Sequence, residues 1–165
     1  GGGITFESAL SRGATFRAAL PLDCSAAEAP SPAAAAGAPA VGARVIVVED
    51  QPAVRAVVCS MLDALGCDVE DFASPEGALI RVADPAEVDL LITDLVMPGM
   101  DGRELMRRAR QHRPGLPVLF MSGYAESPDD STLARDPQSD FIAKPFNPNE
   151  LAAKVATLLT RPRAI

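Results

Sequence analysis

Five residues with chemically active side chains stand at or just after the end of a short predicted strand. They are Glu49, Asp50, Asp94, Ser122 and Lys144. Clustered carboxylates repel one another and resist ionisation unless a cation neutralises them, and a hard divalent ion such as Mg²⁺ is the natural counter-charge. Lys144 would supply a second positive group for an incoming anion. One carboxylate must then be free to attack, and Asp94 is the central candidate for that nucleophile.

These side chains can cooperate only if the strands that carry them end at the same edge of one sheet. From residue 44 onward, predicted strands alternate with predicted helices. The predicted strands cover residues 44–49, 67–72, 89–93, 117–121 and 140–144. Such repeats predict an α/β fold with a doubly wound, five-stranded parallel sheet and helices on both faces. The carboxyl ends of parallel strands share one edge, so the five side chains are expected to converge there.

Capping residues and prolines mark where the predicted helices begin. Pro52 opens the first helix, and Ser74 is the expected N-cap of the second. A third helix is expected near residues 101–111, and prolines leave at most a short helix around 130–135. Asn147, with an acid three residues later, predicts a capping box at the start of the last helix.

Residues 1–43 differ in composition from the rest of the chain. Alternating apolar positions in residues 1–22 predict two short strands with a turn near residues 11–13. Residues 23–43 are dominated by alanine, proline, serine and glycine, which predicts a linker. The expected organisation is therefore a pair of strands, a linker, and an α/β domain over residues 44–165.

The composition narrows the classes of function. Lys plus Arg number 15 and Asp plus Glu number 22, a net charge of −7, which argues against nucleic acid or an anionic membrane as the main partner. No apolar run approaches the roughly 18 residues that span a bilayer, and no signal peptide opens the chain. The three cysteines lack CxxC spacing, which argues against a zinc site or a disulfide framework and favours a reducing cytoplasm.

Four motifs resemble those of one known family. VVED at 47–50, TDLVMPGMDG at 93–102, MSGY at 121–124 and FIAKPF at 141–146 resemble, in order and spacing, the receiver domain of two-component response regulators. The resemblance covers residues 44–160. It implies a flavodoxin-like fold with strand order 2-1-3-4-5, and a phosphorelay function in which the domain accepts a phosphoryl group from phosphohistidine.

The resemblance also implies a role for each candidate residue. Asp94 corresponds to the phospho-accepting aspartate, and Lys144 to the lysine that contacts the phosphoryl group. Ser122 corresponds to the switch hydroxyl and Phe141 to the switch aromatic. The implied Mg²⁺ site comprises Asp50 as a direct ligand, Glu49 acting through water, Asp94, and the backbone carbonyl of Val96. A cis peptide bond between Lys144 and Pro145 is implied as well.

Other interpretations of these residues stay open. Glu49 and Asp50 could be acids that favour a helix N-terminus, and Lys144 could be a solvated strand end, although their joint placement at one edge is harder to explain in this way. A phosphatase of the haloacid dehalogenase type needs a general acid two residues after the nucleophile, where Val96 cannot donate a proton. A phosphorylation-independent docking module is the alternative function, and the intact acids and lysine argue against it.

The first 22 residues have a separate, shorter resemblance. The segment GATFRAALP resembles the closing strand of the ATP-binding catalytic domain of histidine kinases. A kinase remnant, a linker and a receiver together imply the C-terminal part of a hybrid histidine kinase. The chain contains no helix with a donor histidine and no nucleotide-binding boxes, so it is not expected to act as a kinase. Whether the receiver catalyses its own phosphorylation and dephosphorylation stays open.

The resemblance implies a histidine kinase or a histidine phosphotransfer protein as partner. The receiver is expected to be monomeric and cytoplasmic, even where the parent sensor kinase is anchored in a membrane. Only residues 160–165 follow the last predicted helix, so no DNA-binding output is expected.

Overall fold

The computed structural model describes residues 3–9, 13–19, 40–123 and 136–162. The chain divides into two compact units, Gly1–Ala34 and Ala35–Ile165. In the first unit, β1 (Gly3–Ala9) and β2 (Gly13–Ala19) form an antiparallel pair with Phe6 opposite Phe16, as the alternating apolar positions predict. Most of the predicted turn and of the predicted linker lies outside the described residues.

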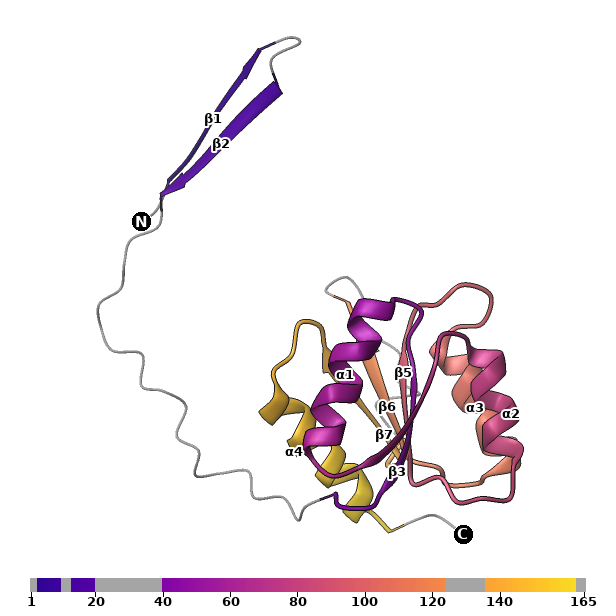
Figure 1. Ribbon diagram of the computed structural model, residues 1–165. Helices are drawn as coiled ribbons and strands as arrows, with labels where there is room; N and C mark the ends of the chain where they lie inside the picture. Colours follow the sequence, from indigo (N-terminus) through magenta and orange to yellow (C-terminus); the bar gives the residue numbers. More distant parts are fainter. Residues whose placement is uncertain (1–2, 10–12, 20–39, 124–135, 163–165) are drawn as a thin grey trace. The chain divides into compact units, whose positions relative to one another are not determined.

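The second unit contains a five-stranded parallel sheet (Figure 1). Its strands are β3 (Arg44–Val48), β4 (Asp68–Phe72), β5 (Leu90–Asp94), β6 (Val118–Ser122) and β7 (Ser139–Ala143). The order across the sheet is β4-β3-β5-β6-β7, which confirms the predicted 2-1-3-4-5 arrangement. β5 therefore lies at the centre of the sheet, and Asp94 is its last residue.

Helices cover both faces of this sheet (Figure 1). α1 (Pro52–Ala64) and α4 (Pro148–Thr160) pack on one face, and α2 (Pro75–Ala83) and α3 (Gly102–His112) pack on the other. The short helix expected around residues 130–135 lies outside the described residues. Among the described helices, none is both long and apolar enough to cross a membrane.

The sheet separates two hydrophobic cores because successive strand side chains point to opposite faces. Val45 and Val47 pack in the core beneath α1 and α4. Ile46 and Val48 pack in the core beneath α2 and α3. Both faces are covered, so nearly every position of the central strands is apolar, and each buried large side chain contributes about 1.5–3 kcal/mol. This packing fixes the strand ends that carry the site.

The ends of the elements differ slightly from the sequence predictions. Asn147 forms the predicted capping box with Glu150, and Asp101 caps α3 by accepting from the Glu104 amide at 2.7 Å. Ser74 precedes α2 as predicted, but its side chain makes no capping hydrogen bond. Glu49 lies one residue beyond its strand rather than inside it, although its amide still donates to the Phe72 carbonyl at 3.1 Å.

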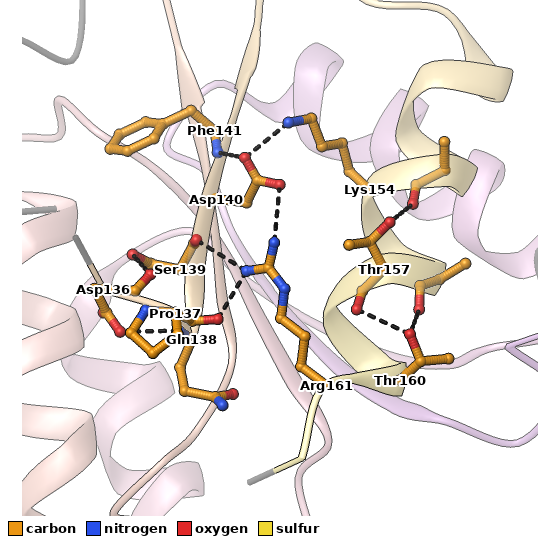
Figure 2. Close-up of polar contacts among 12 residues, drawn as sticks. Asp136, Pro137, Gln138, Ser139, Asp140, Phe141, Lys154, Thr157, Thr160 and Arg161 are labelled. Carbon is orange, nitrogen blue, oxygen red and sulfur yellow. Dashed lines mark hydrogen bonds and ion pairs between the residues drawn. The ribbon is translucent and has the colours of Figure 1, made fainter. Parts of the chain in front are cut away.

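The free edge of β7 is held by side chains from α4 and from Arg161, the residue that follows it (Figure 2). Lys154 Nζ donates to Asp140 Oδ1 at 2.7 Å, and the same oxygen accepts from the Phe141 amide at 2.8 Å. Arg161 Nη1 donates to the carbonyls of Pro137 and Ser139 at 2.8 and 3.3 Å. These contacts occupy backbone groups that an edge strand would otherwise offer to another chain.

Candidate functional site

Three carboxylates meet at the carboxyl edge of the sheet. Glu49 and Asp50 directly follow β3, and Asp94 ends β5, the strand next to it. One carboxylate oxygen from each residue lies within 4.8 Å of the other two. Neighbouring parallel strands end side by side, so the topology itself creates this acidic cluster.

Lys144 joins the acidic cluster from the end of β7. Its Nζ donates to Glu49 Oε2 at 2.6 Å and to Asp94 Oδ2 at 2.8 Å. Its backbone amide donates to the Ser122 carbonyl at 2.7 Å, which anchors the residue beside β6. The following Lys144–Pro145 peptide bond is cis, as the family resemblance implied.

Burial and neighbouring charge have opposite effects on the pKa of Glu49, and also on the pKa of Lys144. Glu49 is fully buried, and burial raises its pKa above the ordinary carboxyl value, although the ammonium of Lys144 acts to lower it. Burial alone would lower the pKa of Lys144, but its hydrogen bonds to Asp94 and Glu49 outweigh that effect and raise it. Lys144 is therefore a cation at neutral pH.

The acidic cluster has the composition of a divalent-cation site. Asp50 Oδ1 is buried and has no hydrogen-bond partner among the described residues. A buried carboxylate oxygen without a partner is costly, and oxygen-rich acidic clusters are the sites that Mg²⁺ prefers. When ionised, the three carboxylates exceed the single ammonium of Lys144 by two negative charges. The residues present therefore fit Mg²⁺.

The remaining candidates lie around this cluster. Ser122 ends β6 and is buried. Phe141 of β7 stacks on the fully buried Phe120, with ring centroids 5.1 Å apart and ring planes at 25°. Val96 lies two residues beyond β5, and its side chain is exposed.

Two residues that the sequence analysis missed contact the backbone of the site. Arg55 of α1 donates through Nη1 to the Glu49 carbonyl at 2.7 Å. Gly102 begins α3 so close to β5 that a Cβ there would collide with the Asp94 carbonyl. Both residues could have been noticed in the sequence. Arg55 lies one turn into the helix that follows Glu49 and Asp50, and Gly102 directly follows the helix cap Asp101.

An apolar groove of about 520 Å³ lies beside Lys144, between α1 and the segment that connects β7 to α4. Its lining includes Val54, Val57, Met61, Lys144, Pro145 and Phe146. Val57 is 52% exposed, which is unusual for an apolar residue on a packed helix. A large apolar surface next to a charged site is typical of a place where another protein binds.

Residues 45–156 match the model of the response regulator receiver domain family. The chain belongs to this family. Two-component phosphorelay signalling is therefore the setting in which this receiver works.

Curated relatives extend the match. Sensor kinase CckA from Brucella abortus is 34% identical over 170 aligned positions, which cover 98% of this chain and 18% of that kinase. Transcriptional regulatory protein TcrA from Mycobacterium tuberculosis is 32% identical over 73% of this chain and 47% of its own length. The chain thus spans about a fifth of the sensor kinase and about half of the regulator.

Solved structures confirm the receiver fold. The receiver domain of the hybrid histidine kinase CckA superposes with a TM-score of 0.60 and 36% identity, covering 71% of this chain and 99% of that one. Chemotaxis protein CheY4 of Vibrio cholerae gives a TM-score of 0.64 at 29% identity, over 72% of this chain and all of that one. Both matches agree with the predicted flavodoxin-like architecture.

Proposed function

We propose that this receiver accepts a phosphoryl group on Asp94 from the phosphohistidine of a histidine kinase or a histidine phosphotransfer protein. One observation supports this most directly: the Lys144 ammonium contacts both Asp94 and the buried Glu49, while Asp50 beside them has a buried oxygen without a hydrogen-bond partner in the described part of the chain. The site thus combines a nucleophile, a fixed cation and room for a second cation.

The proposed reaction is a direct transfer between partner and receiver. A carboxylate oxygen of Asp94 bonds to phosphorus while the phosphorus–nitrogen bond of the phosphohistidine breaks and its electron pair returns to the imidazole. Asp94 keeps 10% of its side chain exposed, whereas Glu49 has none. Lys144 touches Asp94 and can hold the incoming phosphoryl oxygens as their charge develops.

The acidic cluster is proposed to bind the divalent cation. Glu49, Asp50, Asp94 and the carbonyl of Val96 would hold Mg²⁺, which when bound neutralises charge on the phosphoryl oxygens. The buried Asp50 oxygen has no hydrogen-bond partner among the residues that the structure describes, and a bound cation would compensate its burial.

Ser122 and Phe141 are proposed to convert phosphorylation into a change of shape. Met121, next to Ser122, pairs with Asp94 across β5 and β6, so Ser122 lies at the same sheet edge as the proposed acceptor. A phosphoryl group on Asp94 would recruit that hydroxyl and shift the packing of Phe141 against Phe120. This is a two-state population shift driven by a local charge.

The partner's phosphohistidine is proposed to approach along the apolar groove beside Lys144. The groove is lined in part by Lys144, which contacts Asp94, so a helix seated there would bring its histidine near the acceptor. Its apolar lining supports a protein partner rather than a small polar ligand. The receiver itself is proposed to act as a cytoplasmic monomer, and its free Cys59 and Cys67 agree with a reducing compartment.

Residues 1–22, 23–43 and 44–165 are proposed to be a kinase catalytic-domain remnant, a linker and the receiver. The alignment with a sensor kinase over 98% of the chain supports this division, because it extends beyond the receiver into the first unit. The two antiparallel strands agree with the end of such a catalytic domain. The parent protein would then be a hybrid histidine kinase.

Intact mass spectrometry after incubation with acetyl phosphate and Mg²⁺ tests the proposal. The wild-type chain should gain the mass of one phosphoryl group, and Asp94→Asn should gain none. Asp101→Asn is the matched control, because Asp101 lies in the same loop and asparagine is also a good helix cap. Equal labelling of the wild type and Asp94→Asn would contradict the assignment of Asp94 as the phosphoryl acceptor.

A further inference from the structure

Arg55 stands out among the ion-paired residues because it contacts the backbone of the site. It lies in the first turns of α1 and is 18% exposed. Its Nε donates to Asp71 Oδ2 of β4 at 2.8 Å, and its Nη1 donates to the Glu49 carbonyl at 2.7 Å. One guanidinium therefore connects α1, the end of β4 and the loop that bears the acids.

The Glu49 carbonyl belongs to the peptide unit that joins Glu49 to Asp50. A peptide unit is planar and includes the Cα atoms of both residues. Holding its oxygen therefore fixes the orientation of the unit to which both side chains are attached. Glu49 points inward to Lys144, and Asp50, whose buried Oδ1 has no partner among the described residues, lies with it in the acidic cluster. A rotation of this peptide unit would separate the two carboxylates.

We infer that Arg55 is a positioning residue for the acidic cluster: it orients the Glu49–Asp50 peptide unit so that both carboxylates face one bound divalent cation. This rests on the proposed function of the site. Asp71 holds the guanidinium in place from the other side, and the rigid fork of arginine suits two acceptors at once. Arg55 contacts neither the phosphoryl donor nor the attacking carboxylate in this account.

Arg81 offers a matched comparison within the same fold. It is also 18% exposed and also pairs with a carboxylate of β4, Glu70, at 2.7 Å. It projects from α2, and its Nη1 donates to the Ala86 carbonyl at 3.4 Å rather than to the backbone of the acidic cluster. The two arginines therefore share burial and ion pairing, and differ in the bond to the Glu49 carbonyl.

Mg²⁺ binding measured by titration calorimetry tests this inference on the full chain. Groups that orient metal ligands typically change affinity by about 10- to 100-fold when removed, so Arg55→Met should weaken Mg²⁺ binding by roughly tenfold. Arg81→Met should bind Mg²⁺ as the wild type does. Asp71→Asn should bind nearly as well as the wild type, because the bond to the Glu49 carbonyl remains.

The thermal midpoint of unfolding distinguishes a positioning role of Arg55 from a general effect on stability. Arg55→Met and Arg81→Met should lose similar stability, and only Arg55→Met should need more Mg²⁺ for half-maximal phosphorylation while keeping most of its rate at saturating Mg²⁺. If Arg55→Met does not fold, Arg55→Gln replaces it: its shorter amide can still meet Asp71 but not the Glu49 carbonyl, and it should show the same weakened binding.

Equal Mg²⁺ affinity in the wild type and the Arg55 variants would overturn the inference. That result differs from a failure of the proposed function, in which the wild type gains no phosphoryl group at all. In that case, weaker Mg²⁺ binding by Arg55→Met would still support the positioning role.

Discussion

Lys144 neutralises parts of two carboxylates with one ammonium, so its removal should strongly slow phosphorylation of Asp94. Lys144→Met leaves Glu49 buried without its cation and Asp94 without its contact. We expect phosphorylation by acetyl phosphate to slow by about 10²–10³-fold, the range for losing one charge-stabilising donor. Rates followed by intact mass would measure this.

Lys154→Met is the matched control for that change. Lys154 also forms a lysine–aspartate pair, with Asp140 at 2.7 Å, but it lies on α4 away from the acidic cluster. It should lose little of the phosphorylation rate. Similar losses in both variants would show that Lys144 has no special role.

Gly102 sets the distance between α3 and the acceptor strand. In Gly102→Ala, the new methyl group meets the Asp94 backbone oxygen, and neither backbone can move freely. Such overpacking typically costs about 1–3 kcal/mol, so we expect a lower free energy of unfolding together with slower phosphorylation.

Gly77→Ala on α2 is the comparison for that prediction. Its new methyl group would approach a Phe72 side-chain carbon at 3.0 Å, and an aromatic side chain can shift where a strand backbone cannot. Denaturant unfolding should therefore show a smaller loss than for Gly102→Ala. A larger loss in Gly77→Ala would contradict the packing argument.

The residues of the site were predictable from sequence to different degrees. Glu49 and Lys144 directly follow strands, and Asp94 ends one. These strands can be recognised in the sequence, so the topology alone brings the three residues together. The role inferred for Arg55 depends on the rotation of α1 about its axis and on its height above β3. Hydrophobic spacing sets that rotation only coarsely, so sequence could not show which carbonyl the guanidinium meets.

At the level of elements, helix starts were easier to predict than their side-chain contacts. Asn147 forms its capping box because an acid stands three residues later. Ser74 also stands directly before a proline at the first helical position, but its side chain accepts no capping hydrogen bond. β4 can carry several acids because it lies at the edge of the sheet, where none of its residues is fully buried.

Arg110 ties the end of α3 to the entry of β7, and this contact should depend on pH. Arg110 Nη1 donates to Asp136 Oδ2 at 2.5 Å, and both side chains are largely buried. Burial alone would raise the pKa of Asp136, but the hydrogen bonds from Arg110 and from the Gln138 amide outweigh it and lower the pKa below 3.8.

Because its pKa is lowered in the folded chain, Asp136 stabilises the fold in its ionised form. The unfolded chain binds the proton more readily, so the ionised Asp136 stabilises the fold above pH 3.8, and this stability is lost as the pH falls through the lowered pKa. The stability advantage of the wild type over Asp136→Asn should therefore be full near neutral pH and shrink in acid. Urea unfolding across this range measures it, and a constant difference would contradict the assignment.

At the level of the whole molecule, both hydrophobic cores belong to the second unit. Their buried members run from Val45 to Leu158, and Ala40 packs against one of them. A chain that begins at residue 40 should therefore keep the thermal midpoint and the phosphorylation of the full chain. A clear loss of either would show that the first unit supports the receiver.

A chain that begins at residue 44 should be less stable than one that begins at 40. It lacks the hydrogen bond from the Gly42 amide to the Gly66 carbonyl and the acceptor for the Asp68 amide, both at 2.8 Å. Two such bonds contribute about 1–3 kcal/mol together. Equal midpoints for the two shortened chains would contradict a structural role for residues 40–43.

Trapping the acyl phosphate chemically shows which residue carries the phosphoryl group, and we propose that this residue is Asp94. Borohydride reduces an aspartyl phosphate to homoserine, and peptide mass spectrometry then locates the altered residue. After incubation with acetyl phosphate, we predict homoserine at position 94 and only when Mg²⁺ is present. Homoserine elsewhere in the acidic cluster, at position 50 for example, or an unaltered chain under the same conditions, would contradict the account.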